Sequence, residues 1–166
     1  MNWFVLLVAI VAAVVVLGGL FLVATANRLD RLHVRLDAGW AALDAALARR
    51  SVVARAVAAG ALPPPEGACL REAADAAETA PRPDREAAEN ELTRLLAVID
   101  RDRLPPRLAD ELADAEQRVV IARRVHNDAV RDTLALRRRR KVRYFKLAGT
   151  APQPEYFEIA EPDPAT

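Results

Sequence analysis

The side chains that most often carry catalysis or bind metals stand apart from one another in this chain. His126 lies on an apolar helical seam, where a metal-binding or acid–base role would need a second ligand or an orienting partner at helical spacing. Position 123 is arginine and no Glu-x-x-His pattern occurs, which also removes the di-iron pattern of helical bundles. We therefore expect His126 to be a packed structural side chain, and His33 to be a residue of a helix face.

Nucleophilic and phosphate-binding motifs find no support in the sequence. Ser51 lacks a Gly-x-Ser-x-Gly elbow, and Cys69, the single cysteine, has no matching histidine and closes no internal disulfide or cysteine-based zinc cluster. The 6 glycines are too dispersed for a phosphate loop. Carboxylates alternate with arginines around helix faces, which is typical of a solvated, salt-linked surface. The sequence predicts no enzyme, no metal and no cofactor.

One group of side chains rises above this background, near the end of the last predicted helix. It consists of Arg137, Arg138, Arg139, Arg140, Lys141, Arg143 and Lys146, interleaved with Tyr144 and Phe145. Anionic lipid attracts such cations by about 1 kcal/mol each near the surface, and aromatic rings anchor at the interface. The alternative is that these cations favour a helix C-terminus. We expect contact with anionic headgroups. A net charge of +1 argues against a nucleic-acid binder.

The N-terminal stretch predicts a transmembrane anchor. No charged side chain occurs between Trp3 and Ala26, and a helix of this length spans roughly 36 Å, enough for a bilayer core. Trp3 places an amphipathic ring at one interface, and Arg28 places the first guanidinium at the other. Ala9 and Ala13, four residues apart, would let a second copy approach closely, which leaves a homo-oligomer open.

A cleavable secretory signal peptide is the competing interpretation, because residues 24–26 fit the small-x-small cleavage pattern. Signal peptides usually carry a positive n-region and an apolar core of about 7 to 15 residues, and this stretch has no basic side chain before a longer core. Arg28, Arg31 and Arg35 follow the span and none precede it. The positive-inside rule therefore predicts a single-pass protein of the inner, cytoplasmic membrane, with its N-terminus outside and its C-terminal domain in the cytoplasm.

Helical periodicity dominates the chain beyond the span. Scarce glycine and 5% aromatic residues are typical of an all-α domain rather than a sheet. The apolar run passes without a proline into a stripe at three- and four-residue spacings, which predicts one helix to about Ala59 with Gly60 as its stop. The stripe comprises Leu29, Leu32, Leu36, Trp40, Leu43, Leu47, Val53 and Val57. Charges at heptad spacing flank it, as in a coiled coil.

Two short helices are predicted between proline breaks. Three prolines at 63–65 precede an alanine-rich helix over residues 66–79. Two more prolines follow, and Asp84 is the expected N-cap of a third helix, which ends near Asp102.

The last predicted helix has the longest seam, from Pro106 to Arg140. Two long and two short helices with brief breaks suit an antiparallel up-down bundle. Prolines without periodicity predict a mostly disordered ending. The expected domains are therefore a transmembrane anchor at 1–26, a cytoplasmic antiparallel helical bundle at 27–148 and a proline-rich tail at 149–166.

Four blocks of residues resemble the LemA family of bacterial membrane proteins, and together they cover nearly the whole chain after the span. Residues 27–50 contain Asn-Arg-Leu, Ala-Gly-Trp, Leu-Asp and Leu-Ala-Arg-Arg, similar to the first-helix block of that family. Residues 89–93, Glu-Asn-Glu-Leu-Thr, resemble its Glu-Asn-Glu-Leu motif. Residues 122–130 resemble its long last helix, and residues 155–158, Glu-Tyr-Phe-Glu, resemble its aromatic-acidic ending.

The chain also departs from the family pattern. His126 stands where the family prefers tyrosine, Thr133 and Leu134 replace a second Tyr-Asn pair, and Arg55 stands about where a proline is common. The segment 63–83 matches poorly. The chain thus resembles a divergent member. The resemblance implies a membrane anchor with an antiparallel bundle and no established biochemical activity, and the chain lacks the Nudix box from which some relatives have been labelled hydrolases.

These observations predict a membrane-anchored cytoplasmic scaffold or adaptor without enzymatic activity, which binds a partner protein. The alternative is a lipid-organising or remodelling protein that acts through the basic end of the last helix. The candidate residues for partner binding or for fixing helix register are Glu89, Asn90, Glu91, His126 and Asn127. For Asn90 the two interpretations, an exposed patch residue and a buried polar registry residue, stay open.

Overall fold

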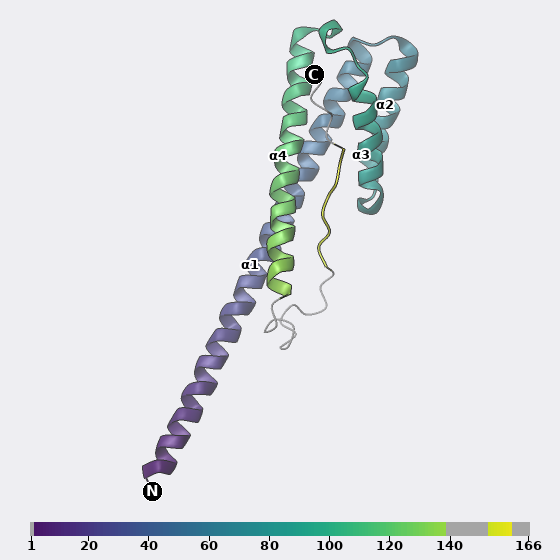
Figure 1. Cartoon of the computed structure of the whole chain (residues 1–166). Helices are drawn as coiled ribbons and strands as arrows, with labels where there is room; N and C mark the ends of the chain where they lie inside the picture. Colours follow the sequence, from purple (N-terminus) through teal and green to yellow (C-terminus); the bar gives the residue numbers. More distant parts are fainter. Residues whose placement is uncertain (1, 139–152, 161–166) are drawn as a thin grey trace. The chain divides into compact units, whose positions relative to one another are not determined.

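The computed structural model describes residues 2–138 and 153–160, and these residues form helices and no strand (Figure 1). The all-α prediction is confirmed. The elements are α1 (Asn2–Gly60), α2 (Pro64–Thr79), α3 (Arg82–Ala97), the short 3-10 helix η1 (Arg101–Arg103) and α4 (Pro106–Arg137). The chain divides into two units, Met1–Asp37 with Ala129–Pro154, and Ala38–Asp128 with Glu155–Thr166.

Proline sets most of the helix starts. Pro64 and Pro106 are the first residues of α2 and α4, where the missing N–H costs no helical hydrogen bond. The predicted N-cap Asp84 is wrong: Pro81 is the N-cap of α3, and Asp84 lies in the first turn, where its N–H bonds the Pro81 carbonyl at 2.9 Å and its charge suits the helix dipole.

The end of α3 also differs from the prediction. The helix stops at Ala97 rather than near Asp102, and η1 follows it. The Asp100 side chain accepts a hydrogen bond from the backbone N–H of Asp102 at 3.2 Å and so caps η1. The predicted continuation of α4 from Arg137 to Arg140 falls partly outside the described residues.

The first unit contains the apolar part of α1. Its most apolar window has a mean hydropathy of 3.1 and no buried residue, so α1 is long and apolar enough to cross a membrane. Thr25 donates its hydroxyl to the Phe21 carbonyl at 2.8 Å, which satisfies this polar group within the helix itself. Further along, Leu29 packs with Leu136, and both are buried.

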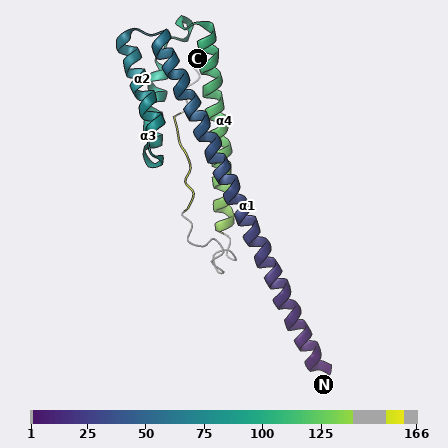
Figure 2. The same ribbon diagram turned by 180° about the vertical axis from the view of Figure 1, so that it is seen from behind.

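The second unit has its own hydrophobic core, to which all four α-helices contribute. The largest cluster of buried side chains joins the end of α1 to α2, α3 and the beginning of α4. Its larger members are Val53, Val57, Leu70, Leu92, Leu96, Leu104 and Leu112. A second cluster consists of Leu43, Leu47, Val119, Phe157 and Ile159. In this unit α2 and α3 lie side by side in both views (Figures 1 and 2).

Two glycines allow helices of the second unit to approach closely. A Cβ atom on Gly67 of α2 would lie 2.5 Å from the Ala58 carbonyl oxygen of α1, closer than any real contact. A Cβ on Gly39 would lie 3.3 Å from the Cα of His126 on α4. Gly39 belongs to the Ala-Gly-Trp block, so its small size seats α4 beside Trp40.

Residues 153–160 are the part of the predicted proline-rich tail that the structure describes. They form no helix or strand, and two of their side chains are buried in the second unit, with Phe157 3% and Ile159 8% exposed. Because Phe157 and Ile159 are two residues apart in an extended segment, both side chains point to the same side and are buried in the core. The composition of the tail did not predict this burial. The rest of the tail lies outside the described residues.

Candidate functional site

A fully buried carboxylate lies at the centre of the second unit. Glu89 on α3 is 0% exposed, and its Oε2 atom lies 2.5 Å from the guanidinium of Arg50 on α1. Its Oε1 atom accepts a hydrogen bond from Nε of Arg85 at 3.3 Å. Arg50 also donates to the Thr93 hydroxyl at 3.0 Å. Two cations therefore hold one anion inside the helical core, and the hydroxyl binds one of those cations and the backbone carbonyl of Glu89.

The network continues from Glu89 toward the surface through Arg85. The Nη2 atom of Arg85 lies 3.0 Å from the carboxylate of Asp44 on α1. Its Nη1 atom donates to the carbonyls of Glu78 and Ala80 at 3.2 and 3.4 Å. The last two carbonyls belong to the end of α2 and the turn after it. Arg85 thereby ties three helices together and satisfies carbonyls that a helix end leaves without partners.

This arrangement is built for architecture rather than for proton transfer. A catalytic carboxylate must reach a substrate, whereas Glu89 is fully buried and each of its oxygens is held by an arginine. Removing one partner of a buried ion pair leaves an uncompensated charge in the core. The network therefore fixes the position of α3 against α1.

The three residues of the Glu-Asn-Glu motif enter three different environments. Glu89 is buried and is not accessible to a partner. Asn90 is half-buried, and its Oδ1 accepts the backbone N–H of Ala160 at 2.8 Å. Glu91 is exposed and pairs with Arg94 at 2.5 Å, a hydrogen bond that lowers the pKa of the Glu91 carboxyl. The buried registry role therefore belongs to Glu89 rather than to Asn90.

Asn127 holds the backbone of the C-terminal segment. Its amide nitrogen donates to the Phe157 carbonyl at 3.1 Å, and its Oδ1 accepts the Phe157 N–H at 2.9 Å. Both polar groups of one peptide residue are thus satisfied by one side chain, as a neighbouring β-strand would satisfy them. The structure brings His126 and Asn127 to the same place, and Asn127 binds the chain's own tail.

Helix α3 also binds the backbone of the C-terminal segment. Oε1 of Glu86 accepts the backbone N–H of Glu158 at 2.8 Å, one turn before Asn90 accepts that of Ala160. Figures 1 and 2 show the later part of the yellow segment, which belongs to the second unit, running beside α3 in both views. We call the space that holds residues 155–160, bounded by Trp40, Glu86, Asn90, His126 and Asn127, the tail groove.

Trp40 forms the floor of the tail groove. The Arg82 guanidinium carbon lies 3.9 Å from the centre of its ring, a cation–π contact. The rings of His126 and Phe157 meet it edge-on at centroid distances of 5.5 and 5.7 Å. A cavity of about 140 Å³ remains between Trp40, the start of α3 and residues 155–157. Phe157, the aromatic anchor of the tail, thus packs edge-on against Trp40, which also contacts Arg82 and His126.

His126 is buried beside Trp40. Neither of its ring nitrogens has a hydrogen-bond partner among the described residues. Burial lowers the pKa of His126, the Glu155 backbone opposes this shift as a nearby acceptor, and the positive charge of Arg82 adds to it. A neutral ring packed on aromatic side chains is the state that this environment favours. In the described part of the chain, no group of three or more His, Cys, Asp and Glu side chains is arranged to hold a metal ion.

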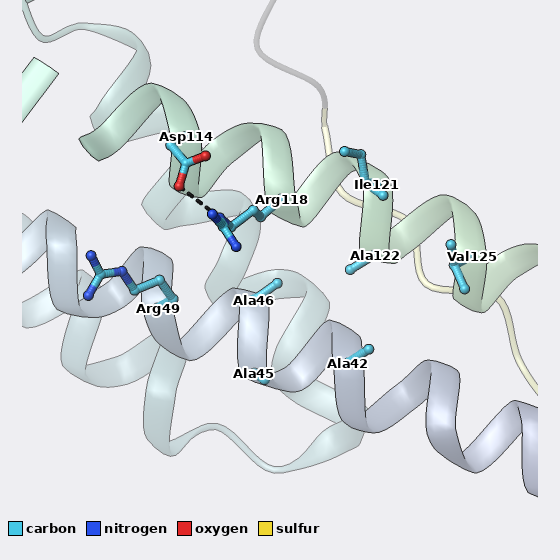
Figure 3. Close-up of a pocket in the computed structure, with 9 residues that line it drawn as sticks. All are labelled: Ala42, Ala45, Ala46, Arg49, Asp114, Arg118, Ile121, Ala122 and Val125. Carbon is cyan, nitrogen blue, oxygen red and sulfur yellow. Dashed lines mark hydrogen bonds and ion pairs between the residues drawn. The ribbon is translucent and has the colours of Figure 1, made fainter. Parts of the chain in front are cut away.

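A second hollow of the same unit lies between α1 and α4 (Figure 3). Its volume is about 650 Å³, and it is lined by Ala42, Ala45, Ala46, Arg49, Asp114, Arg118, Ile121, Ala122 and Val125. Ile121 and Val125 are 53% and 46% exposed. Arg118 pairs with Asp114 at 2.7 Å at one end, so the charges form a rim and the floor is apolar. We call it the α1–α4 groove.

The remaining candidates from the sequence are dispersed. Ser51 is buried in α1, and Cys69 is exposed on α2. Of the basic cluster, only Arg137 and Arg138 lie within the described residues; residues 139–146 lie outside them.

Sequence reasoning missed the ion network and the tail groove, although both left a signal. Arg50 follows Leu43 and Leu47 at seam spacing, and Glu89 precedes Leu92 and Leu96 by three and seven residues. Opposite charges at core positions of two helices therefore indicated a buried pair. The alternation of Phe157 and Ile159 indicated an extended segment with one buried face.

Replacing Glu89 by alanine tests the ion network. Glu89→Ala leaves Arg50 and Arg85 without their shared anion, so the free energy of unfolding should fall by about 3–5 kcal/mol. The measurement is denaturant unfolding of the purified chain followed by circular dichroism. Glu91→Ala is the matched control, because that carboxylate is exposed, and it should leave the unfolding midpoint unchanged. Equal midpoints for both variants would contradict the assignment.

The burial of His126 predicts a dependence of stability on pH. Because folding lowers the pKa of His126, the unfolded chain binds more protons than the folded chain once the pH falls below about 6.5. The contribution of His126 to the free energy of unfolding should therefore be constant above that pH. It should decrease as the pH falls from about 6.5 toward the pKa of His126 in the folded chain. His126→Gln should show a shallower decrease between pH 7.5 and 5. Parallel curves for the two proteins would contradict a titrating His126.

Comparison with known proteins gives no relative from which a function transfers. No protein-family model, curated protein or solved structure matches this chain. The conclusions about function therefore rest on the residues and their geometry.

Proposed function

We propose that this chain is a membrane-anchored helical adaptor of LemA type. In this proposal residues 3–26 cross the inner membrane once, with the N-terminus outside. The rest forms a cytoplasmic antiparallel bundle that binds a partner protein and carries out no catalysis.

The observation that carries the proposal is the apolar window of α1, no part of which is buried. Trp3, Leu17 and Phe21 are 72%, 66% and 48% exposed, and the neighbouring apolar side chains are exposed in the same way. A helix that is apolar on all sides is stable in hydrocarbon and unstable in water. The arginines that follow this window favour the cytoplasmic side for what comes after it.

The α1–α4 groove supports the adaptor role. Its alanines leave room for a helix backbone to come close, and exposed Ile121 and Val125 supply apolar contact area (Figure 3). The size and the apolar floor with a charged rim suit one amphipathic helix of a partner protein. The buried carboxylate Glu89, by contrast, is held by Arg50 and Arg85 in ion pairs that stabilise the fold, which supports a binding role rather than an enzymatic one.

A second candidate function, lipid organisation, is favoured by packing in the first unit. Leu136 of α4 packs with Leu29 of α1, and Arg35 donates a hydrogen bond to Asp132 at 3.3 Å. Leu29 is the third residue after Ala26, where the proposed span ends. This pairing supports a position of the basic cluster near anionic headgroups.

The single cysteine gives a direct test of the topology. Cys69 is exposed on α2, so a membrane-impermeant maleimide should label it only after the cells are permeabilised. A variant with Cys69→Ala and Asn2→Cys is the matched control and should be labelled in intact cells, since the N-terminus faces outward. Labelling of Cys69 in intact cells would overturn the cytoplasmic placement, and loss of the chain to the supernatant in alkaline carbonate would overturn the span.

Photo-crosslinking distinguishes the adaptor from the lipid-organising protein. A photo-reactive residue at Ala45, in the α1–α4 groove, should crosslink a partner protein, whereas the same residue at Asp110, exposed outside that groove, should not. The crosslink should persist when the cations at 137–143 are changed to glutamine. A crosslink that disappears in this variant would favour the lipid-organising function, and equal crosslinking from both positions would contradict the groove.

A further inference from the structure

The tail groove recognises its occupant chiefly through the peptide backbone. Asn127 binds both polar groups of residue 157, and Glu86 and Asn90 accept the N–H groups of residues 158 and 160. Side chains that bind main-chain atoms accept many sequences in extended conformation. The groove thus performs the task that a sheet edge performs when a peptide adds to it.

The spacing of α3 matches an extended peptide. Residues four apart on a helix, such as Glu86 and Asn90, are separated by about 6 Å along its axis. Residues two apart in an extended chain, such as 158 and 160, are separated by about 6.6 Å. Each turn of α3 therefore meets every second N–H of the segment. Successive N–H groups of an extended chain point to opposite sides, so the N–H of residue 157, one residue before this pair, faces α4 and Asn127.

Two side chains of the segment serve as anchors. Phe157 is 3% exposed and packs against Trp40, while Ile159 is 8% exposed. Both belong to the core cluster that contains Leu43, Leu47 and Val119. Tyr156 and Glu158, between and beside them, point outward and are exposed. The groove therefore fits a peptide with an aromatic residue, then a residue of any type, then an aliphatic residue.

Charge adds a further preference. Arg123 of α4 lies 3.5 Å from the carboxylate of Glu158, and Arg82 lies over Trp40 beside the cavity that residues 155–157 line. Glu158, which follows the aromatic anchor, thus meets a cation of α4. Glu155, which precedes the anchor by two residues, lines the same cavity as Arg82 of α3.

We propose that the tail groove is a recognition site for extended acidic peptides with an aromatic anchor and an aliphatic residue two positions later. Residues 155–160 occupy it as an intramolecular ligand, and a segment of the same chemistry from another protein displaces them. A tethered segment competes at an effective concentration on the order of 1 mM, so the partner must be abundant, tight-binding or held at the same surface. The inference does not depend on the proposed function, because it requires neither the membrane span nor the α1–α4 groove.

The test uses the full chain in nanodiscs and a fluorescein-labelled peptide of residues 153–160, Gln-Pro-Glu-Tyr-Phe-Glu-Ile-Ala. The double variant Phe157→Ala, Ile159→Ala removes the anchors of the resident segment and leaves the groove intact. Fluorescence anisotropy should show saturable binding of the peptide to this variant, at least 10-fold tighter than to the unaltered chain. Adding Asn127→Ala to the double variant should weaken binding by about 5-fold or more, from the loss of two hydrogen bonds.

The controls separate recognition from non-specific binding. A peptide with alanine in place of phenylalanine should not bind, and substitution of Asp110, which lies outside the groove, should not change the affinity. The unaltered chain, which keeps every native contact, provides a second measurement: the peptide should exchange into it at higher concentration and should be competed away by unlabelled peptide.

Two results would overturn the proposal. One is the absence of saturable binding to both the double variant and the unaltered chain, which would make residues 155–160 a fixed part of the fold. The other is equal binding of the peptide that lacks phenylalanine, which would make the groove a general apolar surface.

Discussion

The second unit depends on one buried anion shared by two buried cations. Glu89 is stable in the core only because Arg50 and Arg85 approach it from α1 and from its own helix, so α3 cannot rotate or slide without exposing a charge to the apolar interior. This constraint has a consequence on the surface of α3. Glu86 and Asn90 lie roughly 60° and 100° around the helix from Glu89, both on the same side. Fixing Glu89 inward therefore turns both toward the C-terminal segment.

Small residues set how closely the helices approach, and buried charged side chains fix their register. Gly67 lets α2 approach the end of α1, and Gly39 lets α4 approach Trp40, so both helices come close where a Cβ atom would intrude. Buried charges then fix register at positions where alanine-rich surfaces would slide, because alanine offers little shape for interlocking. The α1–α4 groove is the place where alanines on α1 meet α4 without a bulky side chain to fill the gap (Figure 3).

The helices were predictable because their causes are local. An uninterrupted apolar run and a seam without proline predict α1, and prolines predict where α2 and α4 begin. The ion network was not predicted, because a glutamate in a polar motif is usually exposed, and only the pairing of two distant helices makes its burial favourable. The prolines of the tail predict a mostly disordered segment, and the sequence offers Asn127 as a candidate for partner binding or helix register rather than as a residue that binds the tail. Phe157 and Ile159 acquire their burial from side chains of α1 and α4, and α3 binds the backbone beside them, so three helices must pack before the segment has its site.

The most direct test of this account is amide hydrogen exchange of the full chain in nanodiscs, read at individual residues of the tail. The account places residues 155–160 as a bound part of the second unit, with the N–H groups of Phe157, Glu158 and Ala160 held by Asn127, Glu86 and Asn90. It predicts that these three amides exchange much more slowly than an unstructured peptide of the same sequence. Exchange of all three at the rate of the free peptide would show that no groove holds the segment, and would contradict the account.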